Sequence, residues 1–435
     1  MKKIKTVLPV FLLLVTSYTF ASIEKTSHRG WDDCYRMTND SLEVVINTSA
    51  MGNVMVFKRN SVNFMWEDEN INGKGLGDSF SPDAGRFDYG PEKEVREIHD
   101  ITWRGPYTAE IIDDYTLKIT SLEDTVMRIQ TTRLFELDSV HPYLKITQTM
   151  TNISDGNTNY YFWGRTLIPV GGKLFSPVNP ESALEDQWVR YIWGDPTTFS
   201  SDPDDAGVKI EDSLFTMIPE TADNSKYGTD SESGWMAYGY EGMIFLKTYG
   251  YYPDENYTVE NGLTNIFYRT RDRFAEMEPV SPAANLAPGE SYSFVENWYL
   301  IDYPPTSANS FDASEASGHI FSYLETYDTT TSGGNGGGSS SLTELKENNS
   351  LLIYPSPARN DFITIRTNIR YNENPACEIY SLQGTMLKRV VCESSGIGSH
   401  HFKINVSDLP AGTYILRMYP DGKIGSEIGK FSLVK

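Results

Sequence analysis

The chain has 435 residues, 22% of them charged, and a formal net charge of −22 at pH 7. This length predicts more than one domain, and so acidic a surface repels nucleic acid and anionic lipid, which excludes a nucleic-acid partner. The six histidines and three cysteines show no zinc-ligand spacing. No phosphate-binding loop or nucleophile elbow is present either. The composition therefore suits an uncharged or cationic ligand and predicts no metal site.

The first 21 residues, MKKIKTVLPVFLLLVTSYTFA, predict a secretory signal peptide. Lys2, Lys3 and Lys5 form its basic start, and an apolar run from Val7 to Phe20 follows. That run is short for a membrane span, and no stop-transfer pattern comes after it. We therefore expect an exported protein with no transmembrane segment in the mature chain.

Residues 22–328 predict one large all-β module. Short runs rich in β-branched and aromatic residues alternate with turn residues such as Asp113-Asp114 and Ser154–Asn157. The clearest predicted strands are Leu42–Ile46, Asn53–Lys58, Thr116–Ser121, Val126–Leu137, Tyr143–Asn152 and Gly242–Tyr252. The stretch His319–Tyr327 fits either a helix or a last strand. Roughly 300 residues of this kind favour one large antiparallel sandwich over several small domains.

A flexible linker is predicted at residues 329–341, TTTSGGNGGGSSS, because Gly/Ser-rich stretches behave as flexible coil. All eight tryptophans precede it, so residues 342–435 form a different module. Its alternating strands and its tight turns at Gln383-Gly384 and Asp421-Gly422 predict a small antiparallel β-sandwich. Cys377 and Cys392 lie close together there and could form a disulfide, which would leave Cys34 unpaired.

This tail resembles the C-terminal sorting domain of the type IX secretion system of Bacteroidetes. The matching pieces are Tyr354–Pro357, Tyr380–Gly384, Leu409–Tyr414 and the terminal KFSLVK. The resemblance implies export through the periplasm and outer membrane, to the cell surface or the medium. It also implies that the secretion machinery is a partner of the tail.

The body resembles galactose mutarotase-like proteins, a superfamily related to the aldose epimerases. The opening INTSAMGNVMVFKRNSVNFMWE, the strand LKITQTMTNISD and the ending EPVSPAANLAPGESYSFVENWYL carry this likeness, which is spread over most of Leu42–Leu300. The resemblance implies a supersandwich of two large antiparallel sheets with a carbohydrate-binding cleft. The body is identified as a member of an exported branch of that superfamily.

Glu276 and Glu278 are the candidate catalytic residues. Side chains alternate between the faces of a strand, so the two carboxylates point the same way. Close carboxylates repel, which raises one pKa and can divide the pair into an acid and a base. The resemblance places the general base at Glu278, directly before Pro279.

The sequence departs from the mutarotase pattern where a histidine should protonate the sugar ring oxygen. The segment Asn159–Gly172 supplies Trp163 and Arg165 but no histidine. Arg165 could bind the carboxylate of an acidic sugar, or pair with a structural Asp or Glu. Among the remaining histidines, His99 could approach a cleft, and His141 fits a structural turn.

Aromatic side chains give a second carbohydrate signal, because Trp and Tyr offer flat apolar faces that suit sugar rings. The segment Asp186–Pro196 contains Trp188, Arg190 and Trp193, which are candidate ligand-binding residues together with Trp163 and Arg165. The neighbouring loop Phe199–Asp212 is acidic and matches a calcium loop only in part. We expect no cofactor there, with calcium as the weaker alternative.

The sequence predicts an exported carbohydrate-binding or carbohydrate-active protein. An active protein would act on a poly- or oligosaccharide through Glu278, as an epimerase, lyase or glycosidase. Two alternatives stay open. The body could be a glycan-binding protein that has lost the mutarotase histidine, or a surface-structural protein without a ligand.

Overall fold

The computed structural model describes residues 22–331 and 352–433 with short interruptions. The interruptions are 193–194, 201–204, 206, 220–223, 253–254, 258–261, 271–272, 306, 355–361, 370–375, 382–385, 393–397 and 420–426. The predicted signal peptide and residues 332–341 of the predicted linker lie outside the described residues. None of the helices in the described part combines the length and the hydrophobicity that a membrane span requires.

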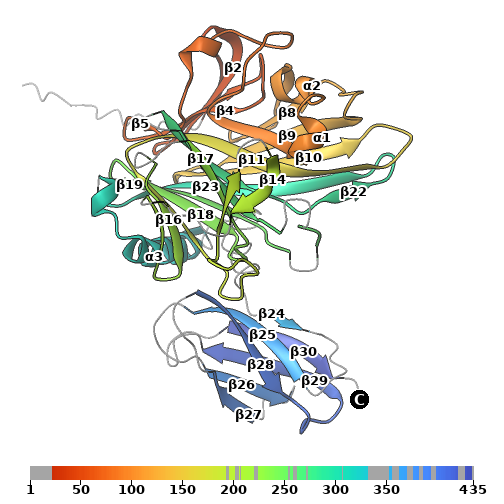
Figure 1. Ribbon diagram of the computed structural model, residues 1–435, viewed down its shortest axis with the longest axis vertical. Helices are drawn as coiled ribbons and strands as arrows, with labels where there is room; N and C mark the ends of the chain where they lie inside the picture. Colours follow the sequence, from red (N-terminus) through yellow and green to blue (C-terminus); the bar gives the residue numbers. More distant parts are fainter. Residues whose placement is uncertain are drawn as a thin grey trace, which may run out of the picture.

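Two large antiparallel sheets form the body (Figure 1), as the all-β prediction requires. The 13-stranded sheet runs in the order β1 (Ser22–His28), β2 (Trp31–Thr38), β3 (Glu43–Asn47), β4 (Val54–Arg59), β6 (Gly85–Gly90), β11 (Thr158–Pro169), β21 (Phe274–Pro279), β20 (Asn265–Arg269), β17 (Ser225–Thr229), β13 (Val189–Ile192) and β14 (Asp195–Ser200), with β5 (Val62–Asn63) on β4 and β22 (Ala284–Leu286) on β11. The 10-stranded sheet runs in the order β15 (Val208–Glu211), β16 (Leu214–Met217), β12 (Lys173–Pro177), β18 (Trp235–Tyr240), β19 (Met243–Tyr249), β23 (Ser291–Asp302), β10 (Tyr143–Asn152), β9 (Ile129–Leu137), β8 (Thr116–Ser121) and β7 (Tyr107–Ile111).

The predicted strands are present, and β8 and β10 have the predicted bounds. Strand β9 begins at Ile129 rather than at Val126. The difference has a local cause: the Asp124 side chain accepts hydrogen bonds from the backbone N–H groups of Val126 and Met127. Asp favours such turns, so the chain turns before it pairs.

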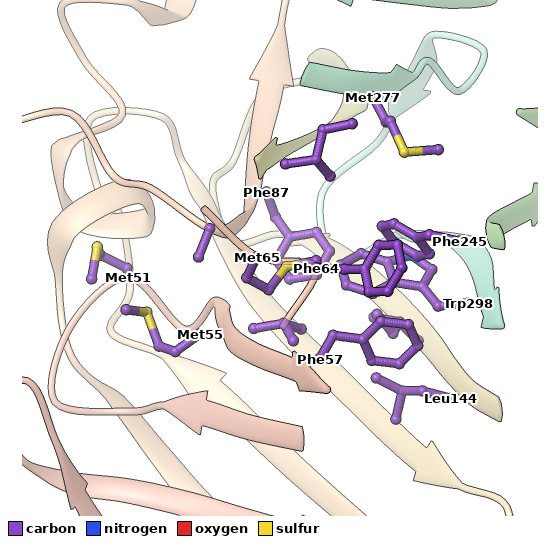
Figure 2. Packing of buried hydrophobic residues seen from close by; sticks show 14 of the residues in the cluster. Met51, Met55, Phe57, Phe64, Met65, Phe87, Leu144, Phe245, Met277 and Trp298 are labelled. Atoms are coloured by element: carbon purple, nitrogen blue, oxygen red, sulfur yellow. The ribbon is translucent and has the colours of Figure 1, made fainter. Parts of the chain in front are cut away.

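The space between the two sheets is filled by a large apolar core (Figure 2). Phe57 contacts Trp298 edge-on, with ring centroids 5.5 Å apart, and both residues are fully buried. Phe87 of β6 and Met277 of β21 belong to the same cluster. Every second side chain of these two strands therefore points into the core. The side chains between them point to the other side of the sheet.

Short helices connect or cover the sheets. Between β6 and β7 the chain forms α1 (Glu92–Val95) and α2 (Asp100–Arg104), and 3-10 turns occur at Glu69–Ile71 and Ala308–Ser310. The stretch predicted as a helix or a last strand is part of α3 (Ala313–Thr331), whose Ile320 and Leu324 pack in one cluster with Trp235. Because α3 continues to Thr331, the first three residues of the predicted linker are helical.

The tail is a small sandwich of two antiparallel sheets, as predicted. One contains β24 (Leu352–Tyr354), β25 (Phe362–Ile369) and β28 (Gly398–Asn405), and the other contains β27 (Met386–Val391), β26 (Ala376–Ser381), β29 (Gly412–Tyr419) and β30 (Glu427–Leu433). Its apolar cluster is made only of tail residues. Cys34, Cys377 and Cys392 are buried free thiols, so the disulfide considered from the sequence is not formed.

We expect the body to fold without the tail, because the body clusters and the tail cluster share no residue. The fragment Ser22–Tyr327 keeps Leu324 and therefore the packed part of α3. Its free energy of unfolding should match that of the body in the mature chain to within about 0.5 kcal/mol, which is the usual scale for changes away from the core. Urea unfolding followed by tryptophan fluorescence reports the body alone, since the tail has no Trp. A fragment that does not unfold cooperatively would contradict the division into two modules.

Candidate functional site

The outer side of the 13-stranded sheet carries an unusual cluster of charged side chains. Arg86 and Asp88 lie on β6, Arg165 on β11, Lys226 on β17, and Glu276 and Glu278 on β21. We call these six residues the charged face. Their strand neighbours Phe87 and Met277 point to the inter-sheet core (Figure 2), so strand alternation places the charged residues on the opposite side. The strand order β6-β11-β21-β20-β17 makes them spatial neighbours.

Strand β11 brings Trp163 and Arg165 to this face because Gly164 lies between them. A Cβ at Gly164 would be 2.4 Å from Oε1 of Glu296, a fully buried carboxylate of the inter-sheet core. Glu296 is paired there with Lys247, at 3.0 Å between Nζ and Oε2. Only glycine lets β11 approach this buried pair closely, so close packing requires glycine between Trp163 and Arg165.

Glu276 and Glu278 share one face of β21, as predicted, and both are buried. Glu278 has no exposed surface and Glu276 is 5% exposed. Oε2 of Glu278 lies 3.4 Å from Nε of Arg165 and 3.2 Å from Nζ of Lys226. The carboxylates therefore do not lie in solvent, and the nearby Arg273 contacts Asp68 rather than this pair.

Burial and charge give the carboxylates of this region different proton affinities. Burial raises the pKa of Glu276 to about 7, against the opposing effect of Arg86, and the nearby Glu278 raises it further. The Arg165 guanidinium lowers the pKa of Glu92, which begins α1, to about 2. The pair thus contains one carboxyl that can exchange a proton near neutral pH.

Arg165 connects three carboxylates. Besides Glu278, its NH1 lies 3.3 Å from Oδ2 of Asp88 and its NH2 lies 3.3 Å from Oε2 of Glu92. Its guanidinium carbon is 4.0 Å from the centre of the Trp163 ring. Of the two roles considered for Arg165, the structural pairing is the one observed, and its ion pairs leave little capacity for an acidic sugar.

A cavity of about 600 Å³ lies next to the charged face, and the segment that contains α1 and α2 forms part of its wall. Its lining includes Arg86, Asp88, Glu92, His99, Trp103 and Arg165. Neither Glu276 nor Glu278 is among the lining residues. The two glutamates therefore lie beside Arg86 and Arg165 and do not line this cavity.

His99 is the functional candidate whose role the sequence did not establish. It is the N-cap residue of α2 and is 7% exposed, and neither ring nitrogen has a hydrogen-bond partner. Its ring packs on Trp103, with centroids 4.5 Å apart, and the Trp103 indole N–H donates to Asp88. Burial lowers the pKa of His99, opposed by Asp88 and assisted by Arg165. The four-residue spacing of His99 and Trp103, which puts them on one side of a short helix, was the available signal.

The predicted aromatic segment divides between the two sides of the sheet. Trp188 belongs to the inter-sheet core and packs edge-on against Tyr227 at 5.4 Å between ring centroids. Arg190 pairs in register with Tyr227, so it shares that side and does not reach the charged face. Tyr191 has the opposite parity, and its ring centre is 5.3 Å from Nζ of Lys226. Trp193 lies outside the described residues.

The described part of the chain contains no group of three or more His, Cys, Asp or Glu side chains that could hold a metal ion. Two acidic residues of the calcium-like loop, Asp202 and Asp204, lie outside the described residues. Asp205 is described, and it is engaged by Arg269 and by the Tyr227 hydroxyl. That carboxylate therefore ties the loop to the sheet.

Replacing Glu276 with glutamine should stabilise the body at pH 8 by roughly 2–3 kcal/mol and change it little at pH 5. The folded-state pKa of about 7 exceeds the ordinary 4.5, so the folded wild type binds more protons between these values. Its stability therefore falls as pH rises through that window, and the amide removes this loss. Urea unfolding from pH 4 to 9 measures the difference. Glu110→Gln, at an exposed position on β7, is the control, and equal pH profiles for both variants would refute the assignment.

The tail is related to a known family. Residues 352–429 match the family described as the secretion system C-terminal sorting domain. This match confirms the predicted type IX sorting tail and indicates that the protein is exported, to the medium or the cell surface. A comparison of the whole chain with curated proteins found no match.

Several solved structures are similar to the body at low identity. A galactose mutarotase-like protein from Lactobacillus casei is 12% identical over 61% of this chain and 99% of its own, with a TM-score of 0.43. A galactose mutarotase related enzyme from Lactobacillus acidophilus is 12% identical over 63% and 99%, with a TM-score of 0.41. A TPR-domain containing protein from Parabacteroides distasonis is 11% identical over 64% of this chain, with a TM-score of 0.45, and the match spans 48% of that protein. The predicted mutarotase-like proteins are thus among the structural neighbours of this all-β chain.

Proposed function

We propose that the body is an exported carbohydrate-binding protein whose ligand occupies the cavity beside His99. The observation that carries the proposal is the pair of buried, unpartnered ring nitrogens of His99 in the cavity lining. Buried polar groups are normally hydrogen-bonded, so an orphaned pair points to an absent partner. A neutral imidazole offers one donor and one acceptor, which complements a sugar hydroxyl.

The size and charge of the cavity support this choice. Its volume of about 600 Å³ lies within the range of about 300–1,000 Å³ for small-molecule sites. The guanidinium groups of Arg86, Arg104 and Arg165 in the lining all have carboxylate neighbours, namely Asp88, Asp100 and Glu92. A site in which these three guanidinium groups are already neutralised favours hydroxyl groups over an additional anion.

Catalysis on the bound glycan is the second candidate function. It is favoured by the raised pKa of Glu276, which belongs to a carboxylate pair beside Arg86 and Arg165. General acid–base catalysis needs groups that exchange protons near the working pH. Because Glu278 is fully enclosed, a reaction through it requires Arg165 or Lys226 to move aside when the ligand binds. The alternative is a surface-structural role without a ligand, and the experiment must distinguish it from carbohydrate binding.

The test is a screen of the purified mature chain, residues 22–435, against soluble polysaccharides and oligosaccharides by calorimetry. Polarimetry and reducing-sugar assays on the same samples detect epimerase, lyase or glycosidase activity. Ser81→Trp places a large side chain in the cavity at an exposed lining position and should abolish binding. Ser293→Trp makes the same change at an exposed position of β23 and should leave binding intact. Failure of every glycan to bind would favour the structural role.

One variant in the same screen tests for catalysis. Glu278→Gln keeps the volume of the side chain and removes its charge, so a catalytic Glu278 predicts a fall in turnover of roughly 10²–10⁴-fold. Unchanged turnover would remove Glu278 from the reaction, and binding without turnover in the wild type would leave the binding function alone.

A further inference from the structure

Two cysteine side chains meet in the core of the sorting tail. Cys377 lies on β26, where it is the register partner of Val390 on β27. Cys392 is two residues beyond Val390 and therefore shares its side of the sheet. Cys377 is fully buried and Cys392 is 5% exposed, and both belong to the tail's apolar cluster. The two thiols are thus diagonal neighbours on the inner side of the same sheet.

Their diagonal placement on one side of the sheet, inside one apolar cluster, puts the two thiols within reach of each other. Diagonal neighbours on antiparallel strands have Cα atoms about 7–8 Å apart, slightly more than the usual 4.4–6.8 Å or so of a disulfide. Cys392 follows the last register-paired residue of β27, Val391. The ladder therefore does not hold Cys392 in place, and a small shift of its backbone can close the remaining gap.

The two thiols also differ in their surroundings. Cys392 is the more exposed of the two and lies just beyond the last paired residue of β27, whereas Cys377 is fully buried within β26. The thiolate is the nucleophile in disulfide exchange, so the more accessible Cys392 is the first to react. The neighbouring Cys377 thiol lowers the pKa of Cys392, which agrees with this order.

We infer that Cys377 and Cys392 are a redox site that closes to a disulfide once the chain has left the cytoplasm. The sorting-domain match places the tail in an exported protein, and disulfides form and persist outside the cytoplasm. The oxidant is a protein or small-molecule disulfide. This inference does not depend on a carbohydrate ligand.

The reaction consists of two exchange steps that balance. The Cys392 thiolate attacks one sulfur of the oxidant, which forms a mixed disulfide and releases the first thiolate. The Cys377 thiol gives up its proton and attacks Sγ of Cys392, which releases the second thiolate. Overall, two protein thiols are oxidised to one disulfide, and one disulfide of the oxidant is reduced to two thiols.

Closing this bond ties Cys392 to β26 and so anchors the end of β27. That strand is an edge of its sheet and exposes Met386, Leu387 and Val391, the last of them 61% exposed. The crosslink restricts the unfolded tail, and for a loop and domain of this size the tail's unfolding midpoint should rise by on the order of 10 °C. The oxidation state of Cys377 and Cys392 therefore determines how tightly the end of β27 is anchored to the sheet.

The experiment uses the reduced mature chain, residues 22–435, with oxidised glutathione as the oxidant. After oxidation the chain is denatured, alkylated with iodoacetamide and weighed by mass spectrometry. The expected result is alkylation of Cys34 alone, against all three cysteines in the reduced chain. Alkylation of Cys377 and Cys392 after prolonged oxidation would overturn the inference, and so would a stable glutathione adduct on either residue.

Matched single variants test the order of the steps. Cys377→Ala should trap a glutathione adduct on Cys392, because the resolving thiol is absent. Cys392→Ala should leave Cys377 unmodified over the same time. Cys34→Ala, in the body, should form the tail disulfide at the wild-type rate. An adduct that forms faster on Cys377 than on Cys392 would contradict the assignment of the nucleophile, and the wild-type mass measurement holds even where a variant folds poorly.

Discussion

Replacing Arg165 with methionine should lower the free energy of unfolding of the body by about 3–5 kcal/mol, the range for a buried ion pair that loses one partner. Arg165 is 8% exposed and lies within 3.4 Å of Asp88, Glu92 and Glu278. Without it the buried Asp88 and Glu278 and the half-buried Glu92 repel one another, and only Arg86 and Lys226 remain to balance them. Urea unfolding at pH 7 measures the loss.

The pH dependence of this variant separates charge from packing. Arg165 lowers the pKa of Glu92, so its removal makes that carboxyl easier to protonate. The destabilisation should therefore shrink toward pH 4, where protonation removes the repulsion. Arg273→Met is the control, because its pair with Asp68 is 3.6 Å long and Arg273 is 57% exposed; exposed pairs contribute about 0–1 kcal/mol. Equal losses in the two variants would show that the charged face is not an electrostatic unit.

Replacing His99 with phenylalanine should reduce affinity for the glycan found by the screen at least about 10-fold, while the stability of the body stays equal or rises. Phenylalanine keeps the ring that packs on Trp103 and removes both nitrogens. In the variant, the ligand hydroxyl that hydrogen-bonds to His99 has no partner. Leaving such a buried polar group unpaired costs about 1–3 kcal/mol. The same nitrogens are unpartnered in the free protein, so their removal relieves a cost of burial. Calorimetry and urea unfolding of one variant measure both effects.

Lowering the pH tests the direction of the His99 pKa shift through its effect on stability. Burial lowers its pKa below the ordinary 6.5, so the folded state binds fewer protons than the unfolded state below that pH. Wild-type stability is therefore lost as pH falls from 6.5 through the folded-state pKa, and His99→Phe should not show this loss. His141→Phe is the control, since His141 contacts Asp138 at a turn away from the cavity lining. A His99 variant that loses stability but keeps affinity would make His99 a structural residue.

Much of the fold was readable from short stretches of sequence. Thr116–Ser121 and Tyr143–Asn152 alternate apolar and polar residues between clear turns, and both are strands with those bounds. The tail was recognisable because its turn and terminal motifs are specific. His319–Tyr327 was ambiguous because a short apolar run fits either a helix or a strand, and packing of Ile320 and Leu324 beside Trp235 decided it.

Residue order alone shows which side chains share one side of a strand, because alternation is a local property of the extended backbone. That was enough to place Glu276 with Glu278 and Trp163 with Arg165. It could not say which strands are neighbours. The pairing of β11 with β6 and β21 is a long-range choice of the folded chain, made by the burial of the whole apolar core.

The roles of the charged residues depend on the three-dimensional arrangement of the folded chain. It put Arg165 between Asp88, Glu92 and Glu278, enclosed the glutamates, and turned Trp188 into the core. It also brought the loop with His99 over the end of the charged face, where a cavity remains. The physical reason is that electrostatic pairing and desolvation depend on distances of a few ångströms between residues far apart in sequence. Residue type and spacing therefore identified the participants, whereas strand order and burial assigned their roles.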